Sequence, residues 1–366
     1  MFFLARKNLL AEKIRLLISV GGVAFSVLLV VVVGGLYRGW ESRITDYIES
    51  IDADLWVGQE GSGDMSHSFS VIPSSLGAEI EKIGGVDSAK EFVGKGVRFE
   101  HDGKETTLRI VGFDPATGEN GPLKMVKGTD KIAEGEIIVD RSFAGLTGAE
   151  IGHTVDIAGV PLEIKGISTG GNLLVYSFAY VTVKDARLIF QLGDATNYFL
   201  VKTSQPLAVK DGIEDKFPQL AAFTKDDFLT QNRSLITDTF LPIIQVLFII
   251  AFIIGVAVVG LTIYTATIEK SREYGVLKAI GATNWQLYLV ILVQSFIAGI
   301  LGYFAGVGLG FVAAQIAEYF VPGFITEIVL SDLVSIFGAA LLMSFIAVWL
   351  PVQRIARIDP ASVFKA

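Results

Sequence analysis

Four long apolar stretches limit what this chain can fold into. They cover residues 14–37, 240–267, 287–320 and 333–350. Each is close to or above the length of about 20 residues that a helix needs to cross the hydrocarbon core of a bilayer. The composition agrees, because 51% of the 366 residues are hydrophobic and the mean hydropathy is +0.55. The sequence therefore predicts a membrane protein with four transmembrane α-helices.

The distribution of Lys and Arg predicts the orientation of the chain. The N-terminus carries four such residues, the 268–286 loop three and the 352–366 tail three, whereas the 321–332 loop carries none. Both termini and the 268–286 loop are therefore expected in the cytoplasm, and the 41–238 segment and the 321–332 loop outside. Arg38 and Arg43 are exceptions to this rule, and Glu41 and Asp46 stand beside them. The first apolar stretch exceeds the core of a signal peptide and lacks a small-residue cleavage site, so we expect an uncleaved anchor.

The segment between the first and second apolar stretches has the pattern of a folded domain. It contains short runs in which apolar and polar residues alternate, which is typical of half-buried strands. The predicted strands are 96–100, 107–111, 136–140, 154–157, 162–167 and 179–183, and the predicted helices are 74–84, 184–192 and 207–216. The fold class is thus a membrane protein of four transmembrane α-helices with a large α+β extracytoplasmic domain, of two lobes, inserted between helices 1 and 2.

The domain boundaries follow from the spans. They are 1–40 for the cytoplasmic N-terminus and helix 1, 41–238 for the extracytoplasmic domain with its stalk helices, 239–267 for helix 2, 268–286 for a cytoplasmic coupling helix, 287–320 for helix 3, 321–332 for an extracytoplasmic loop, 333–351 for helix 4 and 352–366 for the cytoplasmic tail.

Three segments of the inserted domain carry further expectations. The flanks 41–51 and 226–241 keep helical spacing, so they are expected to continue the spans as stalk helices; flexible linkers are the alternative, although neither flank is rich in Pro, Gly or Ser. Residues 54–67 are punctuated by glycine and predict an exposed surface loop, with ligand contact as the alternative. Residues 101–103 (His-Asp-Gly) predict a hairpin turn.

The sequence offers no catalytic residue set. It contains no cysteine, no phosphate-binding loop and no G-x-S-x-G motif. The three histidines, His67, His101 and His153, stand in separate polar loops, so no metal site is expected. No basic patch indicates nucleic acid. We therefore expect a chain that is not an enzyme and binds no cofactor itself.

Small residues recur in the third apolar stretch. Gly302, Gly306 and Gly310 are spaced by four residues, and Gly299 precedes them. Small residues at this spacing let helices approach closely. Two interpretations stay open: a movable contact or dimer seam between chains, or packing among the four helices of one chain.

The charged loop between the second and third stretches carries the most specific pattern. Residues 269–282 (EKSREYGVLKAIGA) predict a short amphipathic helix, which suits a surface gripped by another protein. This run resembles the permease signature of the MacB/FtsX/LolC-type ABC transporters, which work by mechanotransmission. The tail at 351–361 (PVQRIARIDPA) is similar to that family's closing motif. Residues 135–140 and 151–155 resemble a weaker pattern of its extracytoplasmic domain.

The resemblance implies a permease subunit in a bacterial cytoplasmic (inner) membrane. Two copies would form a homodimer and pair with two separate ABC ATPase subunits, which bind ATP and Mg. The loop helix would dock into the ATPase. Carried over to this chain, the ATPase-coupling residues are Glu269, Arg272, Glu273, Gly275, Val276, Leu277, Lys278, Ile280 and Gly281.

Two functions are compatible with this resemblance. The first is export of a hydrophobic or amphipathic substrate such as heme, a lipid, a peptide or an antibiotic, with an adaptor as a further partner. The layout of four spans without a fused ATPase looks closest to heme- and glycolipid-exporting members. The second is signal transmission, in which the chain regulates a cell-wall hydrolase or a signalling partner without transport. A hydrolase that co-purifies with the chain would favour the second.

Overall fold

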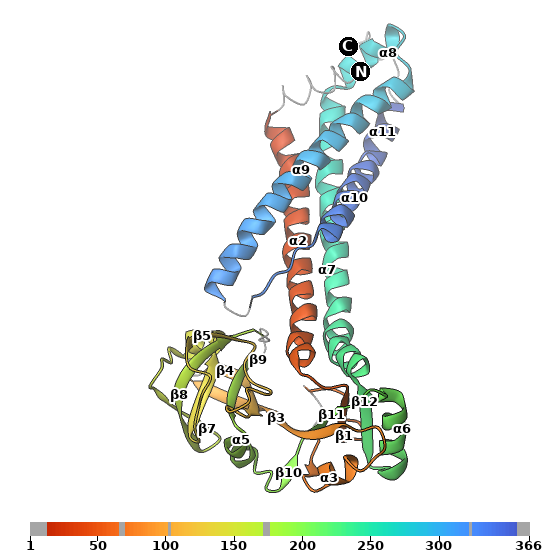
Figure 1. The fold of residues 1–366 in the computed structure, drawn as a ribbon. Coiled ribbons are helices and arrows are strands. Elements are labelled where there is room, and N and C mark those ends of the chain that lie inside the picture. Colours follow the sequence, from red (N-terminus) through yellow and green to blue (C-terminus); the bar gives the residue numbers. More distant parts are fainter. Residues whose placement is uncertain (1–12, 66–69, 102–103, 171–175, 322–323, 357–366) are drawn as a thin grey trace. The chain divides into compact units, whose positions relative to one another are not determined.

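The computed structural model of the chain describes residues 13–65, 70–101, 104–170, 176–321 and 324–356. The chain divides into two compact units (Figure 1). The helical unit consists of Met1–Arg38, Phe240–Phe320 and Thr326–Ala366, and the inserted domain consists of Gly39–Thr239 and Val321–Ile325. Each unit has a hydrophobic core of its own, so the two are described separately.

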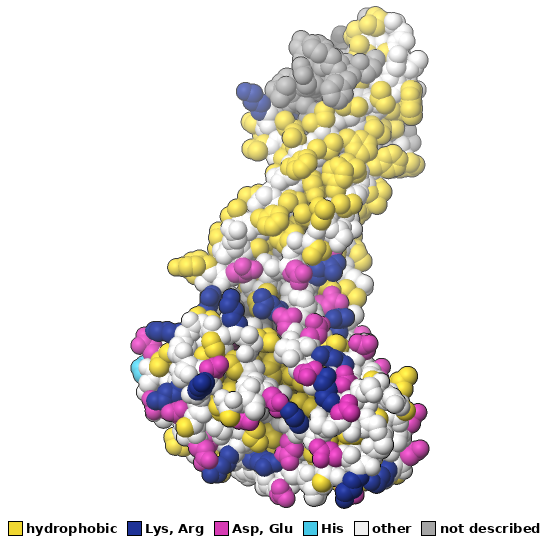
Figure 2. All heavy atoms as spheres, viewed as in Figure 1, with side chains coloured by type: hydrophobic (Ala, Val, Ile, Leu, Met, Phe, Trp, Pro, Cys, Tyr) yellow, Lys and Arg dark blue, Asp and Glu magenta, His cyan; other side chains and the backbone are white. Residues whose placement is uncertain are grey.

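The described residues include four helices that are long and apolar enough to cross a membrane, as the sequence predicts. They are α2 (Lys13–Ser50), α7 (Lys225–Glu269), α9 (Asn284–Phe320) and a fourth span that joins α10 (Leu330–Ala347) to α11 (Trp349–Ala356). The short helix α8 (Ser271–Ala279) stands between α7 and α9. Figure 2 shows hydrophobic side chains covering the visible face of these helices.

The core of the helical unit consists mostly of alanine, valine and isoleucine side chains, with Leu287 and two tyrosines. Val23, Val27 and Val31 of α2 are buried at one-turn intervals, and Val259 of α7 is fully buried in the same cluster. One side of each of these two helices therefore packs against other helices of the same chain. A buried hydrogen bond from Ser295 Oγ of α9 to a carbonyl oxygen of α10, 2.7 Å long, adds a polar link of the kind found between membrane helices.

The flanks of the inserted domain are helical, which favours stalk helices over flexible linkers. Both α2 and α7 are uninterrupted helices that begin or end inside the residues of the inserted domain. Near the end of α2, Tyr47 packs against Phe178 with 4.8 Å between ring centroids. Near the start of α7, Phe228 stacks on Trp56 at 4.5 Å. Both rings on the helices are buried, so each helix end is fixed in the core of the domain.

The inserted domain is built around one large sheet. The strands are β1 (Leu55–Gln59), β3 (Ser88–His101), β4 (Lys104–Phe113), β5 (Lys124–Gly128), β6 (Glu136–Asp140), β7 (Thr154–Ile157), β8 (Val160–Thr169), β9 (Tyr176–Thr182), β11 (Tyr198–Lys202) and β12 (Leu220–Thr224). Their order is β12-β1-β11-β3-β4-β9-β6-β8-β5, and β7 pairs with β8. A separate pair joins β2 (Ile72–Pro73) to β10 (Ala195–Thr196).

Strand β3 belongs to two lobes. Its first half pairs with β11 and its second half with β4. One hydrophobic cluster lies under β1, β11 and β12 with helices α3 (Leu76–Ile80) and α6 (Pro206–Lys216). A second lies among β3, β4, β6, β8 and β9 with α4 (Arg141–Thr147) and α5 (Val183–Phe190). The domain therefore has the expected two-lobed α+β character, with a shared strand between the lobes (Figure 1).

The predicted strands are all found, but one predicted loop is wrong. Residues 54–67 were expected at the surface, whereas 55–59 form β1, which pairs with β11 and β12. Trp56 in this strand is fully buried. Both faces of β1 are covered, so the alternation that identifies half-buried strands is missing. The predicted turn at 101–103 falls partly on residues outside the described part of the chain.

Candidate coupling site

The loop between the second and third spans forms helix α8. Helix α7 ends at Glu269 and α9 begins at Asn284. An acidic residue, Glu273, stands in the first turn of α8, and a basic one, Lys278, in its last turn. These charges complement the helix dipole, which is positive at the N-terminus and negative at the C-terminus. The sequence therefore supports helix formation locally, independently of any partner.

One side of α8 is exposed among the described residues of the helical unit. Val276 is 42% exposed, and Ile280, which follows the last turn, is 75% exposed. Glu273, three residues before Val276, is also exposed. Residues three and four positions apart share one face of a helix. This exposed face, defined by Glu273, Val276 and Ile280, offers two apolar side chains beside a carboxylate, which suits insertion into a groove of another protein.

The opposite side of α8 packs into the helical unit. Tyr274 and Gly275 are buried, and Leu277 packs against the same cluster as Leu287 of α9 and Val352 of α11. Leu277, which we expect on the surface that fills a partner's groove, is half-buried against the chain's own helices, and its part in docking stays a prediction. The inner face therefore holds α8 on α9 and α11.

Helix α8 ends in a C-terminal cap that is formed by Gly281. Its φ of +103° lies in the left-handed region, which a residue with a Cβ rarely adopts. The amide of Gly281 donates to the Lys278 carbonyl oxygen at 3.1 Å, and the amide of Ala282 donates to the Leu277 carbonyl oxygen at 2.9 Å. These two bonds are the Schellman pattern that satisfies free carbonyl groups at a helix end. Gly281 thus has a structural role in shaping the loop.

Two charged residues of the predicted site make contacts within the chain. The Lys278 ammonium group donates to the Ala356 carbonyl oxygen at 3.4 Å, which ties α8 to the end of α11. The Glu269 carboxylate forms an ion pair with Arg15 at the start of α2. Arg272 is exposed in the first turn. The structure therefore splits the predicted coupling residues into an exposed group and a group that positions the helix. The second half of the tail's closing motif, residues 357–361, lies outside the described residues.

The glycines of α9 lie where other helices approach. A Cβ added at Gly302 would fall 2.5 Å from Val23 Cβ, and one at Gly306 would fall 2.6 Å from the Ala24 carbonyl oxygen. A Cβ at Gly310 would fall 2.8 Å from a methyl carbon of Val31. Gly299 faces α10 instead, where a Cβ would fall 2.0 Å from Ser344 Oγ. These distances are far below van der Waals contact, so a larger residue at any of these positions would push α2 or α10 away from α9. The glycines therefore allow close packing between helices of one chain.

A recess lies near the other end of the helical unit. A cavity of about 240 Å³ opens among α2, α7 and the start of α10, with Val31, Ile244 and Phe248 on its apolar walls. The Arg38 guanidinium donates two hydrogen bonds to the Asp332 carboxylate, at 2.5 and 2.6 Å. This contact neutralises Arg38, one of the two cations that the predicted orientation leaves outside. Sequence reasoning missed this pair because its members are 294 positions apart.

The described residues include no group of three or more His, Cys, Asp or Glu side chains that could hold a metal ion.

A buried carboxyl group stands at the start of a helix in the inserted domain. Asp140 is the N-cap of α4 and accepts the Ser142 amide at 2.7 Å. Burial raises the pKa of its carboxyl, and its Oδ2 atom makes no hydrogen bond to the described part of the chain.

Comparison with known proteins assigns this chain to a family. The model described as MacB-like periplasmic core domain matches residues 16–215, and the model described as FtsX-like permease C-terminal matches residues 245–360. The macrolide export ATP-binding/permease protein MacB 2 of Aeromonas hydrophila is 22% identical over 392 aligned positions, which cover 98% of this chain and 59% of that protein.

Two further matches are aligned over almost their whole length. An uncharacterized ABC transporter permease of Mycobacterium tuberculosis is 21% identical, and the match covers 100% of this chain and 99% of that protein. The crystal structure of the periplasmic region of MacB from Actinobacillus actinomycetemcomitans matches with a TM-score of 0.36 at 14% identity, over 51% of this chain and 96% of that one.

The chain spans 59% of the length of the macrolide exporter from Aeromonas hydrophila. The core-domain model alone covers more than half of the chain, and the second model covers most of the remaining helices. The four spans and the α+β domain between the first two agree with both models. The chain therefore belongs to the MacB/FtsX-type family of ABC transporter permeases.

Proposed function

We propose that this chain is the permease subunit of an ABC exporter and that a separate ATPase subunit grips the exposed face of α8. The observation that carries the proposal is the division of α8 into two faces. Glu273, Val276 and Ile280 are exposed, whereas Tyr274 and Leu277 fix the helix on its neighbours. A push on the exposed face would therefore be passed to α9 and α11 rather than absorbed by a loose loop.

The stalk helices are the proposed route from the membrane to the inserted domain. Each of α2 and α7 is a single helix, and its end in the inserted domain is fixed by a buried aromatic side chain, Tyr47 or Phe228. A helix is stiff along its axis because its turns are hydrogen-bonded. Pro242 removes one backbone donor within α7, but the helix continues through it. A displacement of the spans during ATP hydrolysis would then move the inserted domain, and two copies of the chain would work as a homodimer.

The proposed orientation places both termini and α8 in the cytoplasm and the inserted domain outside. This follows from the Lys and Arg distribution. The proposed substrate is a hydrophobic or amphipathic molecule that reaches the outside domain from the membrane or its outer surface. The recess beside Arg38 and Asp332 supports this class, because its apolar walls stand next to a charged pair.

The test is co-purification of the tagged chain from its own host, followed by ATPase assays of the complex in lipid. We expect an ABC ATPase to co-purify. Ile280→Asp and Glu273→Lys should weaken that association or uncouple ATP hydrolysis from the permease. Leu207→Asp is the matched control, because Leu207 on α6 is 70% exposed and lies in the inserted domain. All three variants replace exposed side chains, so their unfolding temperatures should stay close to that of the unmodified chain; the two α8 variants lose at most the roughly 0.3–1 kcal/mol by which a charge interacts with a helix end.

Two outcomes would count against the proposal. Normal association and normal ATPase activity in both α8 variants would show that the exposed face is not the coupling surface. Capture of the ATPase together with a cell-wall hydrolase, with no movement of any amphipathic compound, would assign the chain to signal transmission instead of export.

A further inference from the structure

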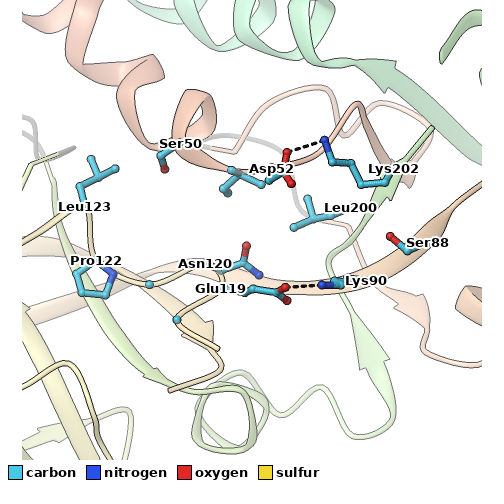
Figure 3. A pocket seen from close by; sticks show the side chains of 13 residues that line it. Ser50, Asp52, Ser88, Lys90, Glu119, Asn120, Pro122, Leu123, Leu200 and Lys202 are labelled. Carbon is cyan, nitrogen blue, oxygen red and sulfur yellow. Dashed lines mark hydrogen bonds and ion pairs between the residues drawn. The ribbon is translucent and has the colours of Figure 1, made fainter. Parts of the chain in front are cut away.

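The inserted domain holds a polar cavity of its own. It measures about 340 Å³ and lies between the end of α2, strands β3 and β11, and the loop at 118–123 (Figure 3). This volume is at the lower end of the range of pockets that bind small molecules, roughly 300–1,000 Å³. The cavity is built entirely from residues of the inserted domain.

One wall of the cavity is a pair of neighbouring strands. Leu200 of β11 stands opposite Lys90 of β3, and Lys202 stands opposite Ser88. Residues that face each other across two strands, and residues two positions apart along a strand, point to the same side of the sheet. All four side chains therefore face the cavity, while Val201, between the two β11 residues, is buried in the hydrophobic cluster on the opposite side.

The facing wall is a loop held in one conformation. Asn120 has a φ of +60°, which Asn tolerates better than other residues with a Cβ. Its carbonyl oxygen accepts a 2.7 Å hydrogen bond from the buried Tyr47 hydroxyl of α2. The Asp114 side chain accepts the Ala116 amide at 2.9 Å and fixes the start of the loop. The loop is therefore already shaped before any ligand arrives, which lowers the entropy lost on binding.

Two ion pairs border the space, each between a lysine of the sheet and a carboxylate of a facing segment. Lys202 from the sheet pairs with Asp52 just beyond α2 at 2.5 Å, and Lys90 from the sheet pairs with Glu119 of the loop (Figure 3). The Lys202 ammonium lowers the pKa of the Asp52 carboxyl below its ordinary value, so this carboxylate is charged at neutral pH. The pairs are solvent-accessible, and exposed ion pairs contribute at most about 1 kcal/mol, so a charged ligand can replace one partner at little cost.

Neutral polar groups complete the lining. The Asn120 side chain lies in the space between the two ion pairs in Figure 3. Neither the Asn120 amide nor the Ser88 hydroxyl forms a hydrogen bond within the described part of the chain. An amide offers both donors and an acceptor, so it can bind a ligand carboxylate or a ligand amide. Leu200 and Leu123 supply apolar surface for a short hydrocarbon group.

We infer that this cavity binds a small zwitterion, the size of an amino acid or a dipeptide, with one ammonium and one carboxylate group. The ligand carboxylate is held by one of the two lysines and the Asn120 amide. The ligand ammonium is held by Asp52 or Glu119. A ligand that carries only one charge could contact either a lysine or a carboxylate of the cavity, but not both, and it should bind more weakly. This site is independent of the ATPase-coupling role proposed for α8.

The cavity also touches the end of a stalk helix. Ser50 and Ile51 line it beside Asp52, and the loop opposite is hydrogen-bonded to Tyr47 of the same helix. A bound zwitterion would therefore contact both the last turn of α2 and the loop that α2 holds, and it would stabilise one position of that turn. The ligand would act as a signal read by α2, whether or not it is also a transported compound.

The test is calorimetric titration of the full-length chain in lipid nanodiscs with alanylalanine. The comparison compounds are N-acetylalanylalanine, which keeps only the carboxylate, and alanylalanine amide, which keeps only the ammonium. We expect alanylalanine to bind, and each single-charge compound to bind at least about tenfold more weakly, because each loses one charge-assisted hydrogen-bonded contact. Raising the salt concentration should weaken binding, because the contacts are partly exposed.

Two variants and a control locate the site. Lys202→Gln and Asn120→Gly should each weaken alanylalanine binding by roughly tenfold. Glycine at position 120 keeps the positive φ, so loss of binding there would come from the missing amide. Lys184→Gln is the control, because Lys184 forms an exposed 2.7 Å pair with Glu134 outside the cavity lining. Absence of binding at millimolar alanylalanine, equal binding of a single-charge compound, or unchanged binding in both cavity variants would overturn the inference.

Discussion

Replacing Gly306 with alanine should force α9 and α2 apart. The new methyl group would lie 2.6 Å from the Ala24 carbonyl oxygen and 2.7 Å from Val27 Cβ. Both atoms are fixed to the backbone of α2, so no side-chain rotation can relieve the contact. Because carbon atoms normally approach to about 3.5 Å, the helices must separate by roughly 1 Å or bend locally.

The magnitude follows from a comparison with Gly308 on the same helix. Overpacking of a filled contact costs about 1–3 kcal/mol, whereas alanine is favoured over glycine in a helix by roughly 0.5–1 kcal/mol. At Gly308 a Cβ would meet nothing within 4 Å, so only the second effect applies there. The helix preference is common to both variants and cancels in the comparison. Gly306→Ala should therefore be less stable than Gly308→Ala by about 1–3 kcal/mol.

The measurement is equilibrium unfolding of both variants in mixed micelles with a rising fraction of SDS, followed by circular dichroism. Gly310→Ala provides an intermediate case, because the nearest atoms there belong to the Val31 side chain and the closest backbone oxygen is 3.8 Å away. The expected order of stability is Gly308→Ala, then Gly310→Ala, then Gly306→Ala. If Gly306→Ala were as stable as Gly308→Ala, the result would contradict a close contact between α9 and α2 at Gly306.

Three further predictions concern other contacts. Arg38→Gln and Asp332→Asn, combined in a double-mutant cycle of unfolding measurements, should show a coupling of roughly 1 kcal/mol, and strictly additive effects would contradict the ion pair. Gly281→Val should speed hydrogen exchange at the end of α8, because a β-branched residue disfavours a φ of +103° by about 1–2 kcal/mol; unchanged exchange would exclude the cap. Burial raises the folded-state pKa of Asp140, so its contribution to stability is fully present below the unfolded value of 3.8 and is lost as pH rises through the folded value. Asp140→Asn should remove this loss. Urea unfolding at several pH values should therefore show that the free energy of unfolding of the variant rises relative to that of the unmodified chain as pH increases.

Much of the architecture could be predicted because long periodic patterns are local properties of a sequence. The four spans need only their own apolar residues, and strands such as β7 and β8 alternate because one face is solvated. Strands β1 and β11 escaped prediction for the opposite reason. Both are buried on both faces, and their partners lie far along the chain. Helix α4 also escaped, although Asp140 followed by Ser142 is a recognisable cap.

The candidate sites divide in the same way. Helix α8 could be predicted because its motif is continuous in sequence. The Arg38–Asp332 pair and the cavity beside Asp52 could not, because each joins residues from distant segments. Nothing in the local sequence of Lys90 or Lys202 distinguishes these lysines from any other exposed lysine. Only the pairing of β3 with β11 places them on one wall.

The structure also separates two reasons for the residues in the α8 motif. Gly281 ends the helix, and Tyr274 and Leu277 hold it on α9 and α11, so these residues are explained by the chain itself. Val276 and Ile280 are exposed, so packing within the described part of the chain does not account for them. A change at Gly281 or Tyr274 should therefore affect coupling only by moving or loosening α8, together with its stability. A change at Ile280 should affect coupling while α8 stays in place, and this difference separates the docking surface from its support.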